Sequence, residues 1–183
     1  PSTPPLPPLP PLSPGFDVVA ASEAKLRSLI TEAAASQANV SIYLPPRADF
    51  KLGSQISCSS SVKVTVASSG EGATLDGQEQ IGLFYLSGGC SLTLRGLTLV
   101  NGRSAGSGGV VEARNAGDVE IIDSDVRDCS ATYNGGVVYA SNSGAVSIIG
   151  SDVSDCSADA GGVVYAYYSG AVSITGSNVT SCS

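Results

Sequence analysis

The five cysteines of this 183-residue chain are its first candidates for chemistry, and three of them end a repeated phrase. The phrases are Ser-Asp-Val-Arg-Asp-Cys, ending at Cys129, Ser-Asp-Val-Ser-Asp-Cys, ending at Cys156, and Ser-Asn-Val-Thr-Ser-Cys, ending at Cys182. If the repeats stack, equivalent Cα atoms lie one strand spacing apart, within the roughly 4.4–6.8 Å that a disulfide tolerates. We therefore expect Cys129–Cys156 and Cys58–Cys90 disulfides, with Cys182 left for a partner outside this segment. The alternative is small buried thiols that fill a turn.

Aspartates recur in the same phrases: Asp125 and Asp152 share one position, which Asn178 takes next, and Asp128 and Asp155 share another. Two carboxylates about 5 Å apart repel by only about 1 kcal/mol in water, so we interpret these positions as a solvated acidic edge. Calcium, the alternative, needs about six to eight oxygen ligands, and no ligand motif is present. Zinc is disfavoured because the chain has no histidine and no Cys-x-x-Cys. We expect no metal and no cofactor.

Acid–base catalysis requires two groups held in different environments, and equivalent stacked aspartates are not separated in this way. The repeats also contain few cations and no histidine; these cations are Arg95, Arg103, Arg114 and Arg127. We expect no catalytic residue in this segment. Two sequons, Asn39-Val-Ser and Asn178-Val-Thr, are candidate N-glycosylation sites in a secreted chain.

The fold is predicted by the repeat on which these residues lie. Its clearest phrases begin with glycine and stand 27, 27 and 26 residues apart: Gly82-Leu-Phe-Tyr-Leu, Gly109-Val-Val-Glu-Ala, Gly136-Val-Val-Tyr-Ala and Gly162-Val-Val-Tyr-Ala. A fixed period in the twenties is typical of a solenoid, in which each repeat buries its apolar face against its neighbours. The sequence therefore predicts an all-β solenoid of about 26–27 residues per coil, with three short strands in each coil.

Alternation along the strands sorts their side chains into core and surface. The predicted core columns are Phe84, Leu86, Val111, Ala113, Val138, Ala140, Val164 and Ala166 in the first strand, Leu92, Leu94, Val119, Ile121, Val146, Ile148, Val172 and Ile174 in the second, and Leu99, Val126, Val153 and Val179 in the third. The same phase predicts an outward face, which we interpret as a contact surface for another chain or a glycan. The alternative is ordinary strand residues of high β propensity. The residues of this outward face are Tyr85, Glu112, Tyr139 and Tyr165, beside Val110, Val137 and Val163, with Tyr167 and Tyr168 in the last coil.

The start of the chain differs from the repeats. Residues 1–16 are proline-rich and are predicted to form a polyproline II arm. In residues 19–38, Leu26, Leu29, Ile30 and Ala33 recur at helical spacing, so we expect a helix that caps the first coil. The remaining domain is residues 17–183, which we expect to continue beyond residue 183 or to be covered by another chain, because an open solenoid end is a template for aggregation.

An alanine-rich helix, the strand Ile42-Tyr-Leu-Pro-Pro and then turns of short strands resemble the start of pectate-lyase-like right-handed parallel β-helices, over roughly residues 17–183. The Gly-Gly-Val-Val phrases at residues 108, 135 and 161 also resemble polymorphic outer-membrane-protein repeats, although cysteine stands where that family has asparagine. The first resemblance implies a right-handed coil, and many such proteins cleave or bind acidic polysaccharide. The arm resembles hydroxyproline-rich wall and surface glycoproteins, which implies glycosylation at Ser2, Thr3, Pro4, Pro5, Pro7, Pro8 and Ser13.

Composition narrows the function further. The net charge of −7 disfavours nucleic acids and anionic membranes as partners, and no run of about 18 apolar residues exists that would insert into a membrane. We expect a non-enzymatic extracellular structural, assembly or adhesive glycoprotein of a surface or filament, whose partners are glycans and copies of itself or related surface proteins. The alternative is a β-helix that binds or cleaves polysaccharide at a site outside this segment.

Overall fold

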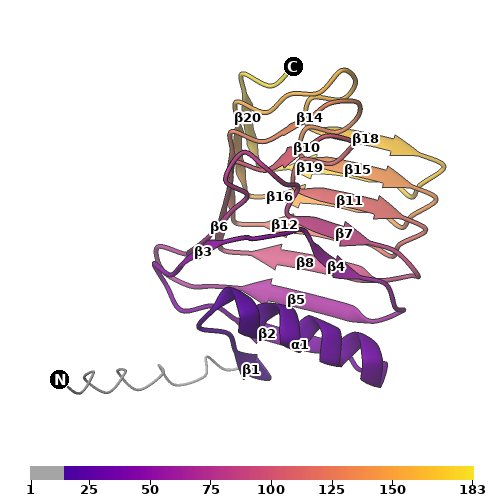
Figure 1. Cartoon of the computed structure of the whole chain (residues 1–183). Coiled ribbons are helices and arrows are strands. Elements are labelled where there is room, and N and C mark those ends of the chain that lie inside the picture. Colours follow the sequence, from indigo (N-terminus) through magenta and orange to yellow (C-terminus); the bar gives the residue numbers. More distant parts are fainter. Residues whose placement is uncertain (1–14) are drawn as a thin grey trace.

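The structure of the protein is a computed structural model that describes residues 15–183, so most of the predicted proline-rich arm, residues 1–14, lies outside the described residues. The described chain is an all-parallel β-solenoid of about six turns (Figure 1), as the repeat predicts. It carries one α-helix in this part of the chain, α1 (Glu23–Ser36).

The chain meets three sheets in each turn, named here A, B and C in that order. Sheet A contains β1 (Val18–Val19), β2 (Val40–Tyr43), β5 (Lys63–Ala67), β8 (Ser91–Arg95), β12 (Val119–Ile122), β16 (Val146–Ile149) and β19 (Val172–Thr175). Sheet B contains β3 (Asp49–Lys51), β6 (Ala73–Asp76), β9 (Leu97–Val100), β13 (Asp125–Arg127), β17 (Asp152–Ser154) and β20 (Asn178–Thr180). Sheet C contains β4 (Ile56–Cys58), β7 (Phe84–Leu86), β11 (Val111–Arg114), β15 (Val138–Ser141) and β18 (Val164–Tyr167).

A short fourth ladder joins β10 (Arg103–Ser104) to β14 (Ser130–Ala131) between sheets B and C. A single bridge from Ser130 to Ser157 extends it into the next coil. The sequence did not predict this ladder. Its signal is the Ser-Ala pair that directly follows both Cys129 and Cys156.

The predicted core columns of sheets A, B and C are confirmed in the inner coils. In sheet A, Leu94, Ile121 and Ile148 pair in register and are completely buried. The column continues at Ile174 with the same register, but this residue is 44% exposed, and Val172 and Val179 of the same coil are 46% and 41% exposed. A side chain inside a solenoid is therefore covered only when a coil lies on both sides of it.

The predicted outward position of Val110, Val137 and Val163 is wrong. Val110 and Val137 are completely buried, and Val163 is partly buried against the core. The amides of Val110 and Val111 both donate to the carbonyl oxygen of Val137, at 2.9 Å each. Strict alternation fails here because the chain turns into sheet C at this point, so two successive side chains point inward.

The corners of the coil are stacked residues in the left-handed backbone region. Sheet C strands β11, β15 and β18 are followed by Asn115, Asn142 and Tyr168, with φ of 51°, 49° and 49°. Asparagine tolerates this region, because its short side chain hydrogen-bonds locally, whereas a bulky residue there is an outlier. Tyr168 is thus the exception in an otherwise regular corner.

Helix α1 lies across the end of the stack at which the chain enters (Figure 1). Its N-cap is Ser22, whose hydroxyl accepts a hydrogen bond from the Lys25 amide at 3.3 Å. Leu26, Leu29 and Ile30 are buried in the same core as the first strands. The helix boundaries fall within the predicted range of residues 19–38.

Candidate functional site

The predicted outward tyrosines form a row across sheet C. Tyr85, Glu112, Tyr139 and Tyr165 pair in register on β7, β11, β15 and β18, and all four side chains are partly exposed. The rings of Tyr139 and Tyr165 stack with centroids 5.9 Å apart and an interplanar angle of 15°. We call Tyr85, Glu112, Tyr139 and Tyr165 the tyrosine row.

The one charged member of the tyrosine row is neutralised within the sheet. The Glu112 carboxylate accepts a hydrogen bond from Arg114 Nε at 2.6 Å, and only 16% of the Glu112 side chain is exposed. The Arg114 guanidinium also lies 4.9 Å from the centroid of the Tyr139 ring, a cation–π distance. The Glu112 carboxylate, its main hydrogen-bond partner, raises the pKa of Arg114. Sequence reasoning counted Arg114 among the cations of the repeats but missed its contact with the row, although its spacing from Glu112 places both on one face of β11.

Two further tyrosines stand at the edge of this face. Tyr167 and Tyr168 are 51% and 76% exposed, and their rings meet edge to face with centroids 4.3 Å apart. Tyr167 occupies the position of Ser141 in the preceding coil, and Tyr168 that of Asn142. The predicted interface residues that lie on the surface are therefore the tyrosines, whereas the valines belong to the core.

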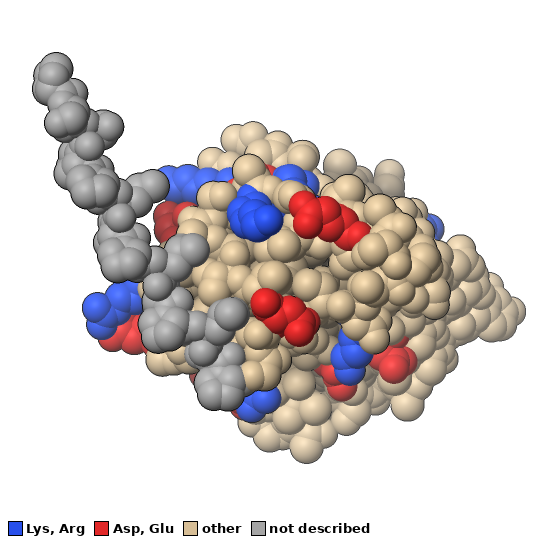
Figure 2. All heavy atoms as spheres, turned by 90° about the horizontal axis from the view of Figure 1, so that it is seen from below, with Lys and Arg blue, Asp and Glu red and all other residues tan. Residues whose placement is uncertain are grey.

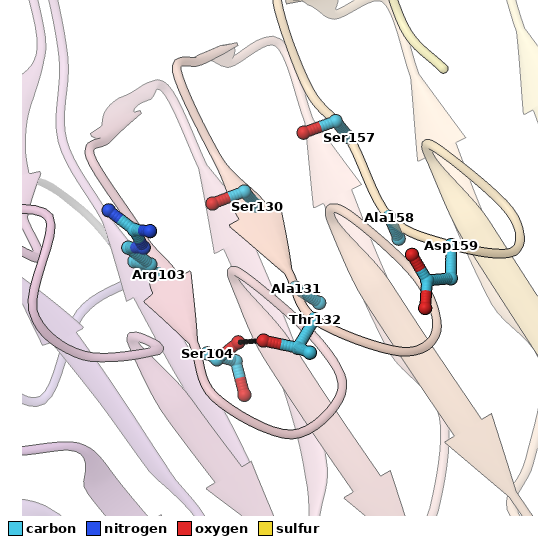
Figure 3. Close-up of a pocket in the computed structure, with 8 residues that line it drawn as sticks. All are labelled: Arg103, Ser104, Ser130, Ala131, Thr132, Ser157, Ala158 and Asp159. Carbon is cyan, nitrogen blue, oxygen red and sulfur yellow. Dashed lines mark hydrogen bonds between the residues drawn. The ribbon is translucent and has the colours of Figure 1, made fainter.

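A polar groove crosses three coils at the β10–β14 ladder (Figure 3). It is a hollow of about 430 Å³ lined by Arg103, Ser104, Ser130, Ala131, Thr132, Ser157, Ala158 and Asp159. Figure 3 shows Arg103 at one side of the groove and Asp159 at the other, with serine and threonine hydroxyls between them. Such a lining can hydrogen-bond an uncharged polyhydroxyl ligand through both donors and acceptors.

One of the two predicted disulfides is present. Cys58 and Cys90 are bonded, with Cα atoms 6.1 Å apart, and both residues are buried. Cys58 ends β4 and Cys90 lies between β7 and β8, so the bond links the end of one sheet C strand to the corner that follows the next sheet C strand. The two cysteines therefore do not occupy equivalent repeat positions.

The predicted Cys129–Cys156 disulfide is not formed, and Cys129, Cys156 and Cys182 are free thiols. Each thiol points at the carbonyl oxygen two residues before it, at 3.3, 3.1 and 3.3 Å respectively. Equivalent side chains with the same orientation keep their sulfurs about one strand spacing apart, roughly 4.8 Å, whereas a disulfide requires about 2.05 Å. Hydrogen bonding to Cys129 and burial raise the pKa of Cys156, which favours the protonated thiol over the thiolate.

We expect loss of the Cys58–Cys90 bond to destabilise the protein by about 3–4 kcal/mol, because it closes a loop with a sequence separation of 32 residues. The double variant Cys58→Ala/Cys90→Ala and the parent chain should be unfolded in urea, with and without reductant. Reductant should weaken the parent but not the double variant. Cys129→Ala, which removes a free thiol, is the control and should keep the sensitivity to reductant. Equal stability of the parent and the double variant would contradict the prediction.

The stacked aspartates lie at the surface of sheet B. Asp125 pairs in register with Asp152, which pairs with Asn178, and Arg127 hydrogen-bonds Asp125 at 3.2 Å. Within residues 15–183, no three cysteine, aspartate or glutamate side chains gather as metal ligands. Seen from the α1 end (Figure 2), acidic and basic side chains are interspersed among wide uncharged areas.

Both sequons lie on the surface. Asn39 is exposed, and its side-chain oxygen accepts a hydrogen bond from the Lys63 amide at 2.7 Å, which leaves the amide nitrogen directed away from that contact. Asn178 is exposed on β20. The candidate glycosylation sites of the arm lie outside the described residues: Ser2, Thr3, Pro4, Pro5, Pro7, Pro8 and Ser13.

No helix among residues 15–183 is long and apolar enough to cross a membrane. Comparisons of the chain with protein-family models, with curated proteins and with solved structures found no match. The family resemblances suggested by the sequence therefore rest on the parallel solenoid alone.

Proposed function

We propose that this protein is an extracellular structural or adhesive glycoprotein, a subunit of a surface or filamentous assembly that joins other copies through sheet C. The observation that carries the proposal is the aromatic surface of that sheet. The tyrosine row lies in register over four coils, and two more exposed tyrosines, Tyr167 and Tyr168, stand at its edge. Contiguous exposed aromatic surface of this kind is typical of interaction sites.

The strained corner at Tyr168 supports the proposal. Asparagine at the two preceding corners would satisfy the backbone, yet a tyrosine occupies the third at φ 49°. Backbone strain of this type costs roughly 1–3 kcal/mol and gathers at functional positions. A large ring is kept at an unfavourable corner, and its exposure of 76% leaves it available to a partner.

The finer features of the proposal follow from the fold and the composition. We propose a right-handed coil, because parallel crossover connections have that hand in about 98% of cases, with α1 as the cap of the first coil and residues 1–16 as a polyproline arm. The buried Cys58–Cys90 bond favours an oxidising compartment outside the cell. The glycans would be attached at Asn39, at Asn178 and along the arm.

The test compares the last coil with the one before it. Tyr167→Ser/Tyr168→Asn gives the last coil the residues that stand at Ser141 and Asn142. We expect the parent chain to associate with rising concentration in analytical ultracentrifugation. The variant should associate at least about tenfold more weakly, which is the loss expected from removing an aromatic anchor. Its folding stability should be unchanged or slightly higher, because Asn relieves the corner strain.

The control is Tyr133→Ser, which removes a tyrosine that is 58% exposed in the loop between β14 and β15 and belongs to no strand of sheet C. It should associate like the parent. A parent chain that stays monomeric at every concentration, or equal losses in both variants, would contradict the assembly function. Mass spectrometry of the secreted chain tests the glycan part at Asn39 and Asn178.

The polar groove favours a second function, polysaccharide binding. Serine and threonine hydroxyls line the groove over three coils, with Ser130 and Ser157 in register, and suit an extended sugar chain. Arg103 and Asp159 in the same lining carry opposite charges, which favours a neutral sugar chain. A glycan array probed with the full chain would separate the functions. Saturable binding that is lost in Arg103→Ala and kept in Tyr167→Ser/Tyr168→Asn would favour this alternative, and release of sugar products would make the protein an enzyme.

A further inference from the structure

The arm has a regular spacing that the tyrosine row can match. In residues 1–14, leucine stands at every third position, Leu6, Leu9 and Leu12, with pairs of prolines between them. A polyproline II helix has three residues per turn and rises about 3.1 Å per residue. In that conformation the leucines would form one ridge that repeats about every 9.3 Å.

Two tyrosines of the row, Tyr85 and Tyr139, are separated by nearly the same distance, whereas Tyr139 and Tyr165 lie on adjacent coils. Tyr85 and Tyr139 occupy the same register position on β7 and β15, two coils apart, with Glu112 of β11 between them. Neighbouring strands lie about 4.8 Å apart, so two coils span about 9.6 Å. Two successive leucines of the ridge can therefore lie beside two successive tyrosines of the row.

The chemistry of the two surfaces also agrees. Because Arg114 pairs with Glu112, which is largely buried, the row has no net charge and presents the rings and phenolic hydroxyls of its three tyrosines, with the Arg114 guanidinium over the Tyr139 ring. Prolines lack the N–H donor, so a polyproline helix offers carbonyl oxygens that need donors. Tyrosine hydroxyls supply such donors, and aromatic-lined grooves are the usual sites for proline-rich segments. Residues 1–14 carry no charged side chain, so the negative charge of the chain does not repel them.

We propose that the leucine ridge of residues 6–12 in one copy binds along the tyrosine row of a second copy. This contact rests on the proposed assembly function and names the segment that occupies sheet C. The ridge runs parallel to the solenoid axis, with two successive leucine side chains beside the rings of Tyr85 and Tyr139.

The position of the residues that follow the arm indicates that the arm binds the tyrosine row of a second copy rather than that of its own chain. The Phe16 ring packs on Tyr43 of β2, with centroids 5.5 Å apart, so the chain enters beside sheet A. Only Ser13 and Pro14 separate Leu12 from Gly15. The three Cα–Cα steps from Leu12 to Gly15 span at most about 11 Å, which leaves little chain for a turn from sheet A to the row on sheet C of the same molecule. The ridge of a neighbouring copy needs no such turn.

The test uses the full chain and a fluorescently labelled synthetic peptide of residues 1–14. The matched peptide has the same composition, but its three leucines are adjacent, so they cannot form a ridge. We expect the native peptide to bind saturably in fluorescence anisotropy and to dissociate the assembled chain. The rearranged peptide should bind about tenfold more weakly. Tyr139→Ala should weaken binding of the native peptide about tenfold, and Tyr133→Ala should leave it unchanged.

Tyr85→Ala is a second variant of the row, and circular dichroism checks that each variant is folded. Equal binding of the two peptides, or equal losses in Tyr139→Ala and Tyr133→Ala, would overturn the proposal. Cross-linking of the arm within single monomeric chains would overturn the contact between copies. If the chain associates but the peptide neither binds nor dissociates it, this contact is wrong while the assembly function stands. Peptide binding by a chain that never associates would instead contradict the assembly function.

Discussion

Gly136→Ala should be among the most damaging single substitutions in this protein. A Cβ atom at Gly136 would overlap the carbonyl oxygen of Gly162 and would lie 2.8 Å from both the amide nitrogen and the carbonyl oxygen of Ser157. All three atoms belong to the backbone of the next coil, which is hydrogen-bonded to the coil of Gly136 and cannot give way as a flexible side chain would. We expect a loss of more than about 4 kcal/mol in the free energy of unfolding, or no folded protein at all.

Gly106→Ala is the matched control, because the nearest atom to its new Cβ is Ser104 Oγ at 3.7 Å, an ordinary contact. It should change stability by no more than about 1 kcal/mol. Urea unfolding followed by circular dichroism measures both variants, and soluble yield serves where Gly136→Ala does not fold. Similar stability of the two variants would mean that the corner before sheet C can open, and would contradict the close stacking of coils at this glycine.

The same glycines mark the limit of what the sequence predicts. The Gly-Gly-Val-Val phrases gave the period, and hence the register of sheet C, correctly. They did not reveal that the chain turns at the two valines, because alternation assumes a straight strand. Val110 and Val137 were therefore assigned to the surface, whereas the shared carbonyl of Val137 and the bend beside it place both in the core.

The candidate sites divide in the same way. The tyrosine row depends only on register and period, so its register and its outward position were predicted correctly. Whether two cysteines form a disulfide depends on the direction of their side chains, which a sequence repeat does not specify. Cys129 and Cys156 are at equivalent positions but turn the same way, whereas Cys58 and Cys90 are at different positions and meet. The polar groove lies on a ladder of two-residue strands, too short for alternation to be visible.

The second large effect is expected in the core column of sheet A, where the same substitution can be made in an inner coil and in the last described coil. Ile121→Ala should destabilise the protein by about 3–4 kcal/mol, because Ile121 is completely buried between Leu94 and Ile148 and the cavity would be enclosed by coils on both sides. For a domain of this size, that loss corresponds to a fall in Tm of roughly 10 °C.

Ile174→Ala makes the same chemical change at the same register position but in the last described coil, where Ile174 is 44% exposed. It should cost only about 1 kcal/mol, because fewer apolar atoms leave contact and solvent can fill the space. Urea unfolding and hydrogen exchange of the sheet A amides measure both, since a solenoid loses stability coil by coil. Equal losses at the two positions would mean that the last coil is covered in solution, and a small loss at Ile121 would mean that the column can collapse around a missing side chain.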